Sequence, residues 1–162
     1  MEYSNSLQRE TLTFIPCGLC AGFISHLYKA LRRKHNPTYI DNLIEKGDEV
    51  WAELVKAMKQ STLFLVVFSE NYASSTWCLN ELVQIMECHK NDQVVNPVFY
   101  HVDPSDVRKH TGSYGTALAK HKKEDKCTIQ RWKNARTIQK WKNALFEAAN
   151  LSGFHNTTYR YY

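Results

Sequence analysis

The sequence predicts an α/β fold in which a small parallel sheet lies between two layers of helices. Short apolar segments with strand propensity alternate with segments whose apolar residues recur every three or four positions. Strands and helices that alternate in this way form βαβ units, because parallel neighbours need a crossover connection. The chain has 162 residues, enough for one domain with its own core and too few for two. We therefore expect a single three-layer domain.

The first expected helix covers residues 23–33, where apolar residues recur at helical spacing and a basic end suits the helix C-terminus. Pro37 breaks this helix, and Thr38–Ile40 is the next expected strand. A polar loop is expected from Asp41 to Glu49. The helix expected after this loop has an apolar stripe of four residues, Trp51, Leu54, Val55 and Met58.

The middle of the chain gives the strongest pattern. Leu63–Phe68 is an uninterrupted apolar run, which is typical of a strand buried on both faces. A helix is expected at about residues 76–89, and a further strand at Val94–Val102. Pro97 removes a ladder donor from that strand and indicates a bulge or an edge position. Asp103-Pro104 then predicts a helix start, with an N-cap followed by proline at the first helical position.

Ligand sites of open parallel sheets lie at the carboxyl ends of the strands. Three segments follow expected strands and should meet there, namely Asp41–Glu49, Ser69–Trp77 and Val102–Asp106. Functional residues are therefore expected in these segments.

A short internal repeat lies near the end of the chain, where residues 128–135 recur almost unchanged as residues 137–144. An offset of nine residues is two and a half helical turns, so Trp132 and Trp141 should face opposite sides of one helix. Trp141 shares its side with three apolar residues, Ile138, Leu145 and Ala148. We expect Trp141 in the core and Trp132 outside it.

The net charge of +5 is concentrated in residues 120–142, which hold nine lysines and arginines against two acidic residues. A solvated helix face is the favoured interpretation, and nucleic acid or an acidic membrane surface is the less favoured one. No apolar run approaches the ~20 residues of a membrane helix. The five cysteines follow no disulfide framework, and the N-terminus has no apolar signal segment. We expect a protein of the cytosol, or also of the nucleus, with no membrane partner.

Two segments identify a family. Residues 66–82 are VVFSENYASSTWCLNEL, and residues 97–108 are PVFYHVDPSDVR. Together with Ser25–Tyr28 and Glu147–Gly153, they closely resemble plant TIR (Toll/interleukin receptor) domains. The resemblance implies a flavodoxin-like fold with four to five strands, self-association with other TIR domains, and a role in plant innate immunity. It also implies hydrolysis of NAD⁺ or NADP⁺, as substrate rather than cofactor, to nicotinamide and ADP-ribose-type signals.

The expected TIR domain covers residues 11–154, between an N-terminal tail of residues 1–10 and a C-terminal tail of residues 155–162. Since the chain ends at Tyr162, we expect a member in which this domain stands almost alone.

The 76–89 helix carries the expected catalytic residues. Its apolar stripe consists of Leu79, Leu82, Val83 and Met86. Glu81 lies off this stripe, and Trp77, one turn earlier, shares its face. A flat ring beside a carboxylate suits stabilisation of an oxocarbenium-like ribose when nicotinamide leaves. The resemblance places the catalytic glutamate at Glu81 and substrate contacts at Trp77 and Ser75. Without the resemblance, a lone glutamate on a helix would be taken as a surface residue.

The pair Ser25 and His26 is the expected self-association site. Ser25 points away from the apolar side of its helix, and His26 flanks it. A Ser-His pair at this place forms an interface between TIR domains in the family that the chain resembles. No metal site is expected, because a lone Cys-x-x-Cys at Cys17 and Cys20 lacks a second ligand pair for zinc. Thioredoxin-like redox chemistry at this motif is likewise disfavoured, and two ordinary thiols are favoured.

The beginning of the domain departs from the family pattern. Plant TIR domains open with a hydrophobic strand followed by Arg-Gly-Glu-Asp-Thr-Arg, whereas Thr11–Cys20 forms a weaker strand without either arginine. Arginine binds phosphates in a bidentate manner that cysteine or leucine cannot replace. An NAD⁺ glycohydrolase is therefore the leading hypothesis. A catalytically impaired TIR module that binds or modulates other TIR proteins is the alternative.

Overall fold

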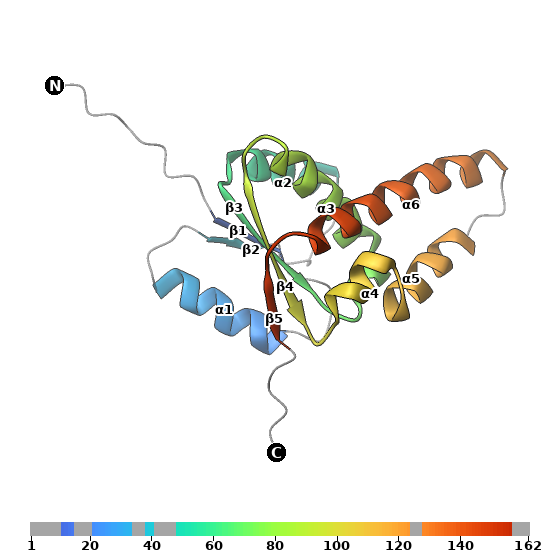
Figure 1. The fold of residues 1–162 in the computed structure, drawn as a ribbon. Helices are drawn as coiled ribbons and strands as arrows, with labels where there is room; N and C mark the ends of the chain where they lie inside the picture. The colour runs from blue at the N-terminus through green and yellow to red at the C-terminus, as the bar shows by residue number, and fades with distance from the viewer. Residues whose placement is uncertain (1–10, 15–20, 34–37, 41–47, 124–127, 157–162) are drawn as a thin grey trace, which may run out of the picture.

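The computed structural model describes residues 11–14, 21–33, 38–40, 48–123 and 128–156. The strands are β1 (Thr11–Phe14), β2 (Thr38–Ile40), β3 (Leu63–Phe68), β4 (Val94–Tyr100) and β5 (Phe154–Asn156). The helices are α1 (Ala21–Arg33), α2 (Asp48–Gln60), α3 (Thr76–His89), α4 (Pro104–Lys109), α5 (Gly112–Lys123) and α6 (Thr128–Ala149). A 3₁₀ turn, η1 (Tyr72–Ser74), precedes α3. Strands and helices alternate along most of the chain (Figure 1), as the apolar pattern predicted.

The five strands form one sheet in the order β2-β1-β3-β4-β5 (Figure 1), and every neighbouring pair is parallel. This order is the flavodoxin-like arrangement, with the direction of winding reversing between β1 and β3. The predicted fold class is confirmed. Where the direction of winding reverses, a crevice forms outside the carboxyl ends of the strands, and such sheets bind their ligands there.

Pro97 lies in β4, one residue before the pairing of that strand with β5 begins. The β3–β4 register runs without interruption through Val66 and Pro97, so the strand has no bulge there. In the described part of the chain, β5 pairs with β4 only from Val98 onward. The strand is nevertheless an inner one between β3 and β5, so the edge alternative is not met either; Pro97 instead lies one residue before the β4–β5 ladder begins.

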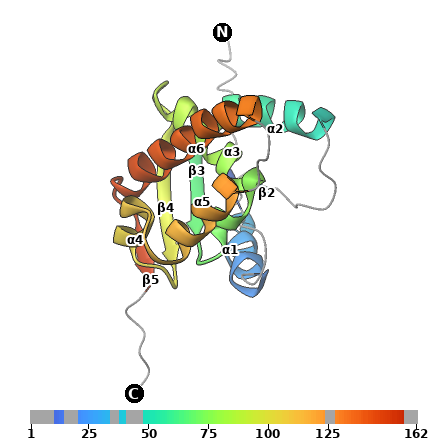
Figure 2. The ribbon, with the colours of Figure 1, turned by 90° about the vertical axis from the view of Figure 1, so that its right-hand side faces the viewer.

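The two faces of the sheet carry unequal layers. On one face, Ile24 of α1 packs against Leu65, Val67 and Val98. On the other face, alternate residues of β3 join a larger core with α2 to α6. Figure 2, turned by 90°, shows α4, α5 and α6 together while α1 lies apart from them. Because β3 is apolar at every position, both of its faces are buried, as its sequence predicted.

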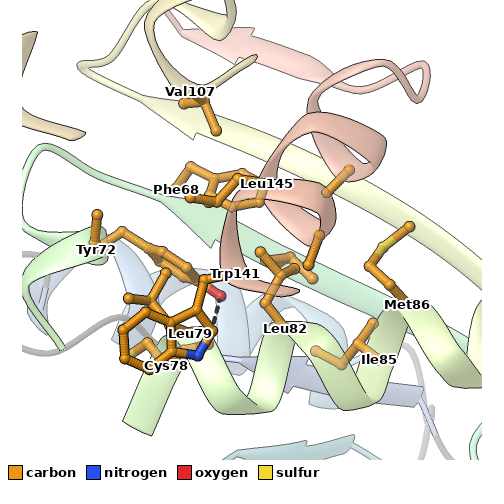
Figure 3. Close-up of a cluster of buried hydrophobic side chains, with 14 of the residues drawn as sticks. Phe68, Tyr72, Cys78, Leu79, Leu82, Ile85, Met86, Val107, Trp141 and Leu145 are labelled. Atoms are coloured by element: carbon orange, nitrogen blue, oxygen red, sulfur yellow. Dashed lines mark hydrogen bonds between the residues drawn. The ribbon is translucent and has the colours of Figure 1, made fainter. Parts of the chain in front are cut away.

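The larger core centres on α3 and α6. Figure 3 shows Leu79, Leu82 and Met86 of α3 meeting Trp141 and Leu145 of α6. Trp141 is only 6% exposed, so the prediction that it belongs to the core is confirmed. Both copies of the repeat lie within the single helix α6. The side chain of Trp132 lies outside the described part of the chain.

The bounds of α2 and β4 differ slightly from the predicted ones. The helix α2 begins at Asp48, so Asp48 and Glu49 are helical and not part of a polar loop. Acidic residues in a first turn are stabilised by the positive end of the helix dipole, and the sequence pattern did not separate this signal from loop polarity. The remainder of that expected loop lies outside the described residues. The strand β4 ends at Tyr100, two residues earlier than predicted.

Candidate functional site at the carboxyl end of the sheet

The site is built where α3 begins, directly beyond the carboxyl end of β3. Ser75 is the N-cap of α3, and its hydroxyl oxygen accepts a hydrogen bond from the Cys78 amide at 3.3 Å. Two tyrosine hydroxyls fasten the preceding turn. Tyr72 donates to the Cys78 carbonyl at 3.2 Å, and Tyr114 donates to the Ser69 carbonyl at 2.9 Å. Burial, with a smaller effect of Cys78, raises the pKa of Tyr114 well above its usual value, so this hydroxyl remains a donor.

Trp77 and Glu81 meet in the first two turns of α3. The indole Nε1 of Trp77 donates to a carboxylate oxygen of Glu81 at 2.5 Å. Trp77 is half-buried, while Glu81 is only 1% exposed. The prediction that the two side chains share one face is confirmed. Both side chains lie beyond the carboxyl end of β3, at the rim of the sheet.

Glu81 is not a surface residue, and this corrects the sequence-based placement. A single apolar stripe was expected on α3, but the helix packs against α6 and also against α2. Cys78 and Ile85 are accordingly buried beside the predicted residues Leu79 and Leu82. A helix covered on two sides buries more than one stripe, so a side chain well off the stripe is enclosed as well.

Trp51 completes the arrangement from the neighbouring helix. It lies in the first turn of α2, and its ring meets that of Trp77 edge-on, with centroids 5.3 Å apart and planes at 81°. Sequence reasoning assigned Trp51 to a core stripe and not to the site. The sequence did contain a signal that could have placed Trp51 at the site. Trp51 and Trp77 both lie in the first turns of helices that follow parallel strands, and such turns share one rim of the sheet.

The other side of α3 is anchored to α6. Asn80, next to Glu81, accepts a hydrogen bond from the indole Nε1 of Trp141 at 2.9 Å. His121 of α5 meets the Trp141 ring at 5.4 Å, and its Nε2 lies 2.9 Å from the Ala73 carbonyl. These contacts join η1, α5 and α6 to the start of α3.

Ser25 and His26 lie elsewhere, on the exposed side of α1. Ile24 points into the core with 3% exposure, while Phe23 stacks on Tyr100 with ring centroids 4.7 Å apart. The predicted orientation of Ser25 is therefore confirmed, since these contacts fix the opposite side of the helix against the sheet. The pair is not brought together with Glu81.

Among the described residues, no group of three or more histidine, cysteine or acidic side chains could hold a metal ion. Lys120, Lys122, Lys133 and Arg136 are exposed on α5 and α6, in agreement with a solvated basic face. None of the helices in the described ranges is long and apolar enough to span a bilayer. Cys17, Cys20 and the segment in place of the family's arginines lie outside the described residues.

Known proteins are similar to most of this chain. A family model described as the TIR domain matches residues 19–161. Disease resistance protein RPV1 of Vitis rotundifolia is 48% identical over 140 residues, which cover 86% of this chain and 9% of that protein. TMV resistance protein N of Nicotiana glutinosa is 47% identical over 136 residues, covering 81% of this chain and 11% of that protein. The chain thus spans about a tenth of the length of these curated relatives.

A solved structure is similar over nearly the whole chain. The TIR domains of the activated Roq1 resistosome, which directly recognizes the pathogen effector XopQ, superpose with a TM-score of 0.76 and 40% sequence identity. The match covers 91% of this chain and 89% of that one.

Proposed function

The chain belongs to the TIR domain family, and on this premise we propose that it cleaves NAD⁺ or NADP⁺ between nicotinamide and ribose as a plant immune-signalling domain. The observation that carries the proposal is the pairing of Trp77 with Glu81 at the carboxyl rim of the sheet. Cleavage of this bond leaves positive charge on the ribose, and a nearby carboxylate stabilises that charge.

Three side chains have distinct roles in this proposal. Glu81 supplies the negative charge, and the Trp77 ring offers a flat surface to the nicotinamide or ribose. Ser75 contacts the substrate at the start of the helix. Its role as N-cap is compatible with this contact, because a serine hydroxyl accepts and donates hydrogen bonds.

The test is nicotinamide release by concentrated protein, comparing the parent chain with Glu81→Gln. The amide keeps the volume of the buried side chain and an oxygen that accepts the Trp77 N–H, so the fold is preserved while the charge is lost. We expect the rate to fall by ~10²–10³. Glu87→Gln, an exposed change on the same helix, is the matched control and should release nicotinamide like the parent. Equal rates for Glu81→Gln and the parent would contradict the enzymatic proposal.

Self-association is proposed at Ser25 and His26, which are exposed on α1. The double variant Ser25→Ala/His26→Ala should weaken concentration-dependent association in sedimentation experiments. Lys29→Ala, an exposed change on the same helix, serves as control. Identical sedimentation of the double variant and the parent over a wide concentration range would exclude this surface.

The alternative function is a non-catalytic TIR module that binds or modulates other TIR proteins. The observation in its favour is the segment Thr11–Cys20, which lacks the two arginines of the family pattern. Grafting Arg-Gly-Glu-Asp-Thr-Arg across Ile15–Cys20 should raise turnover if phosphate contacts limit the reaction, since each charge-assisted hydrogen bond contributes ~1.5–3 kcal/mol. A grafted protein that releases no nicotinamide at high concentration would favour the module.

A further inference from the structure

Trp51 and Trp77 form an aromatic corner, and Trp77 is bonded to the buried carboxylate of Glu81. Each tryptophan lies in the first turn of its helix, and the two ring planes meet at 81°. The Trp77 ring is thus held by an edge contact with Trp51 and by its own hydrogen bond to Glu81. The ring contact bridges α2 and α3, whereas the hydrogen bond lies within α3.

The carboxylate that the proposed reaction needs is buried and bonded to the Trp77 ring. Glu81 is 1% exposed, and one of its oxygens accepts the Trp77 N–H. A ribose carbon cannot come near an oxygen that is enclosed by protein, so stabilisation of its charge requires the side chains over Glu81 to rearrange. When the Trp77 ring leaves, the carboxylate becomes accessible and the ring gains a free face for stacking.

We propose that Trp51 is a positioning residue that holds Trp77 closed over Glu81 and thereby restrains the reaction. The inference deepens the proposed function, because it assigns to the same site a closed arrangement and the residue that maintains it. Opening breaks the contact between the two rings together with the hydrogen bond. A bound substrate would compensate for the lost ring contact, because its own flat ring would replace Trp51 as the partner of Trp77.

The size of the effect follows from the strength of an edge-to-face pair. Such a pair shifts an equilibrium between two arrangements by about 2- to 10-fold. Where the closed arrangement dominates, removal of the Trp51 ring should raise the open population by the same factor. Nicotinamide release at low substrate concentration should then increase by about 2- to 10-fold, because the rate is proportional to the competent fraction.

The experiment compares Trp51→Leu with Trp51→Phe in the full chain. Leucine keeps apolar volume against the half-buried site but removes the ring, whereas phenylalanine retains a ring that can meet Trp77 edge-on. The direct measurement is solvent exchange of the Trp77 indole proton by NMR. The signal of this proton is assigned by its loss in Trp77→Phe.

We expect faster exchange of the Trp77 indole proton in Trp51→Leu, by about 2- to 10-fold, and exchange close to that of the parent in Trp51→Phe. Unchanged exchange in Trp51→Leu would overturn the proposal, as would equally fast exchange in both variants. The Trp141 indole proton is the control for a general loosening of the fold. Its exchange rate should stay constant, because this proton is bonded to Asn80 on the far side of α3.

The activity measurement separates this inference from the proposed function. If the parent releases nicotinamide, Trp51→Leu should release it faster than the parent and Trp51→Phe at the parent rate. Slower or equal release by Trp51→Leu, despite faster indole exchange, would overturn the restraining role. If parent, Trp51→Leu and grafted protein all release none, the proposed function fails, and so does the restraint of a reaction. The exchange measurement would still decide whether Trp51 positions Trp77.

Discussion

Replacement of Trp141 by alanine should destabilise the protein strongly. The side chain is only 6% exposed, and its indole N–H is bonded to Asn80 at 2.9 Å. Truncation of a buried tryptophan costs ~3–5 kcal/mol through lost burial and the cavity left behind. The exposed Asn80 oxygen can turn to water, so its lost partner adds little. For a chain of this size each kcal/mol lowers Tm by about 2–4 °C, which predicts a fall of about 6–20 °C in thermal unfolding.

The internal repeat supplies a matched control for this experiment. Trp132 has nearly the same local sequence as Trp141 but lies nine residues earlier, and helical spacing predicts that it faces the opposite side. Trp132→Ala should change stability by no more than ~0.5 kcal/mol. Trp141→Phe should lie between the two, because it keeps a ring in the core and loses the hydrogen bond. An equal loss of Tm in Trp132→Ala and Trp141→Ala would refute the facing argument.

Three further predictions concern the scaffold. Gly153→Ala should lower the urea midpoint, because a Cβ there would collide with the Pro97 carbonyl oxygen, and overpacking costs ~1–3 kcal/mol. Gln93→Leu should cost ~1–3 kcal/mol in the same measurement, since this buried amide donates to three carbonyl groups at the end of α2; the exposed change Gln139→Leu should cost almost nothing. Burial lowers the pKa of His110, so its contribution to stability is complete above pH ~6.5 and is lost as pH falls through the folded pKa. His110→Asn should flatten this pH dependence of stability, and asparagine tolerates the backbone φ of 57° at that position. A pH dependence unchanged from the parent would show that other groups cause it.

The centre of the fold was predictable from local pattern. The bounds of β3 and α3 match the prediction because an uninterrupted apolar run and an N-capped apolar stripe are both complete within their own segments. Asp103 likewise caps α4 through the Ser105 amide at 2.7 Å, as the Asp-Pro pair indicated. Local signals of this kind need no knowledge of what lies across the sheet.

The candidate site was only half predictable. Helical spacing brought Trp77 and Glu81 to one face, and this follows from a single helix. The burial of Glu81 and the partnership of Trp51 with Trp77 both depend on how neighbouring elements approach α3. Such facts arise from the packing of elements distant in sequence, which periodicity within one element cannot report.

The position of the repeat within α6 bears on how the chain could acquire it. An added nine-residue copy lengthens a helix by about 13–14 Å and rotates everything beyond it by half a turn. In Figure 1 the N-terminal end of α6 extends away from the sheet, while its other end packs over the core. Growth at that projecting end leaves the Trp141–Asn80 contact in register. The same insertion after Trp141 would turn Leu145 and Ala148 to solvent, so the architecture admits length variation at one end of this helix and forbids it at the other.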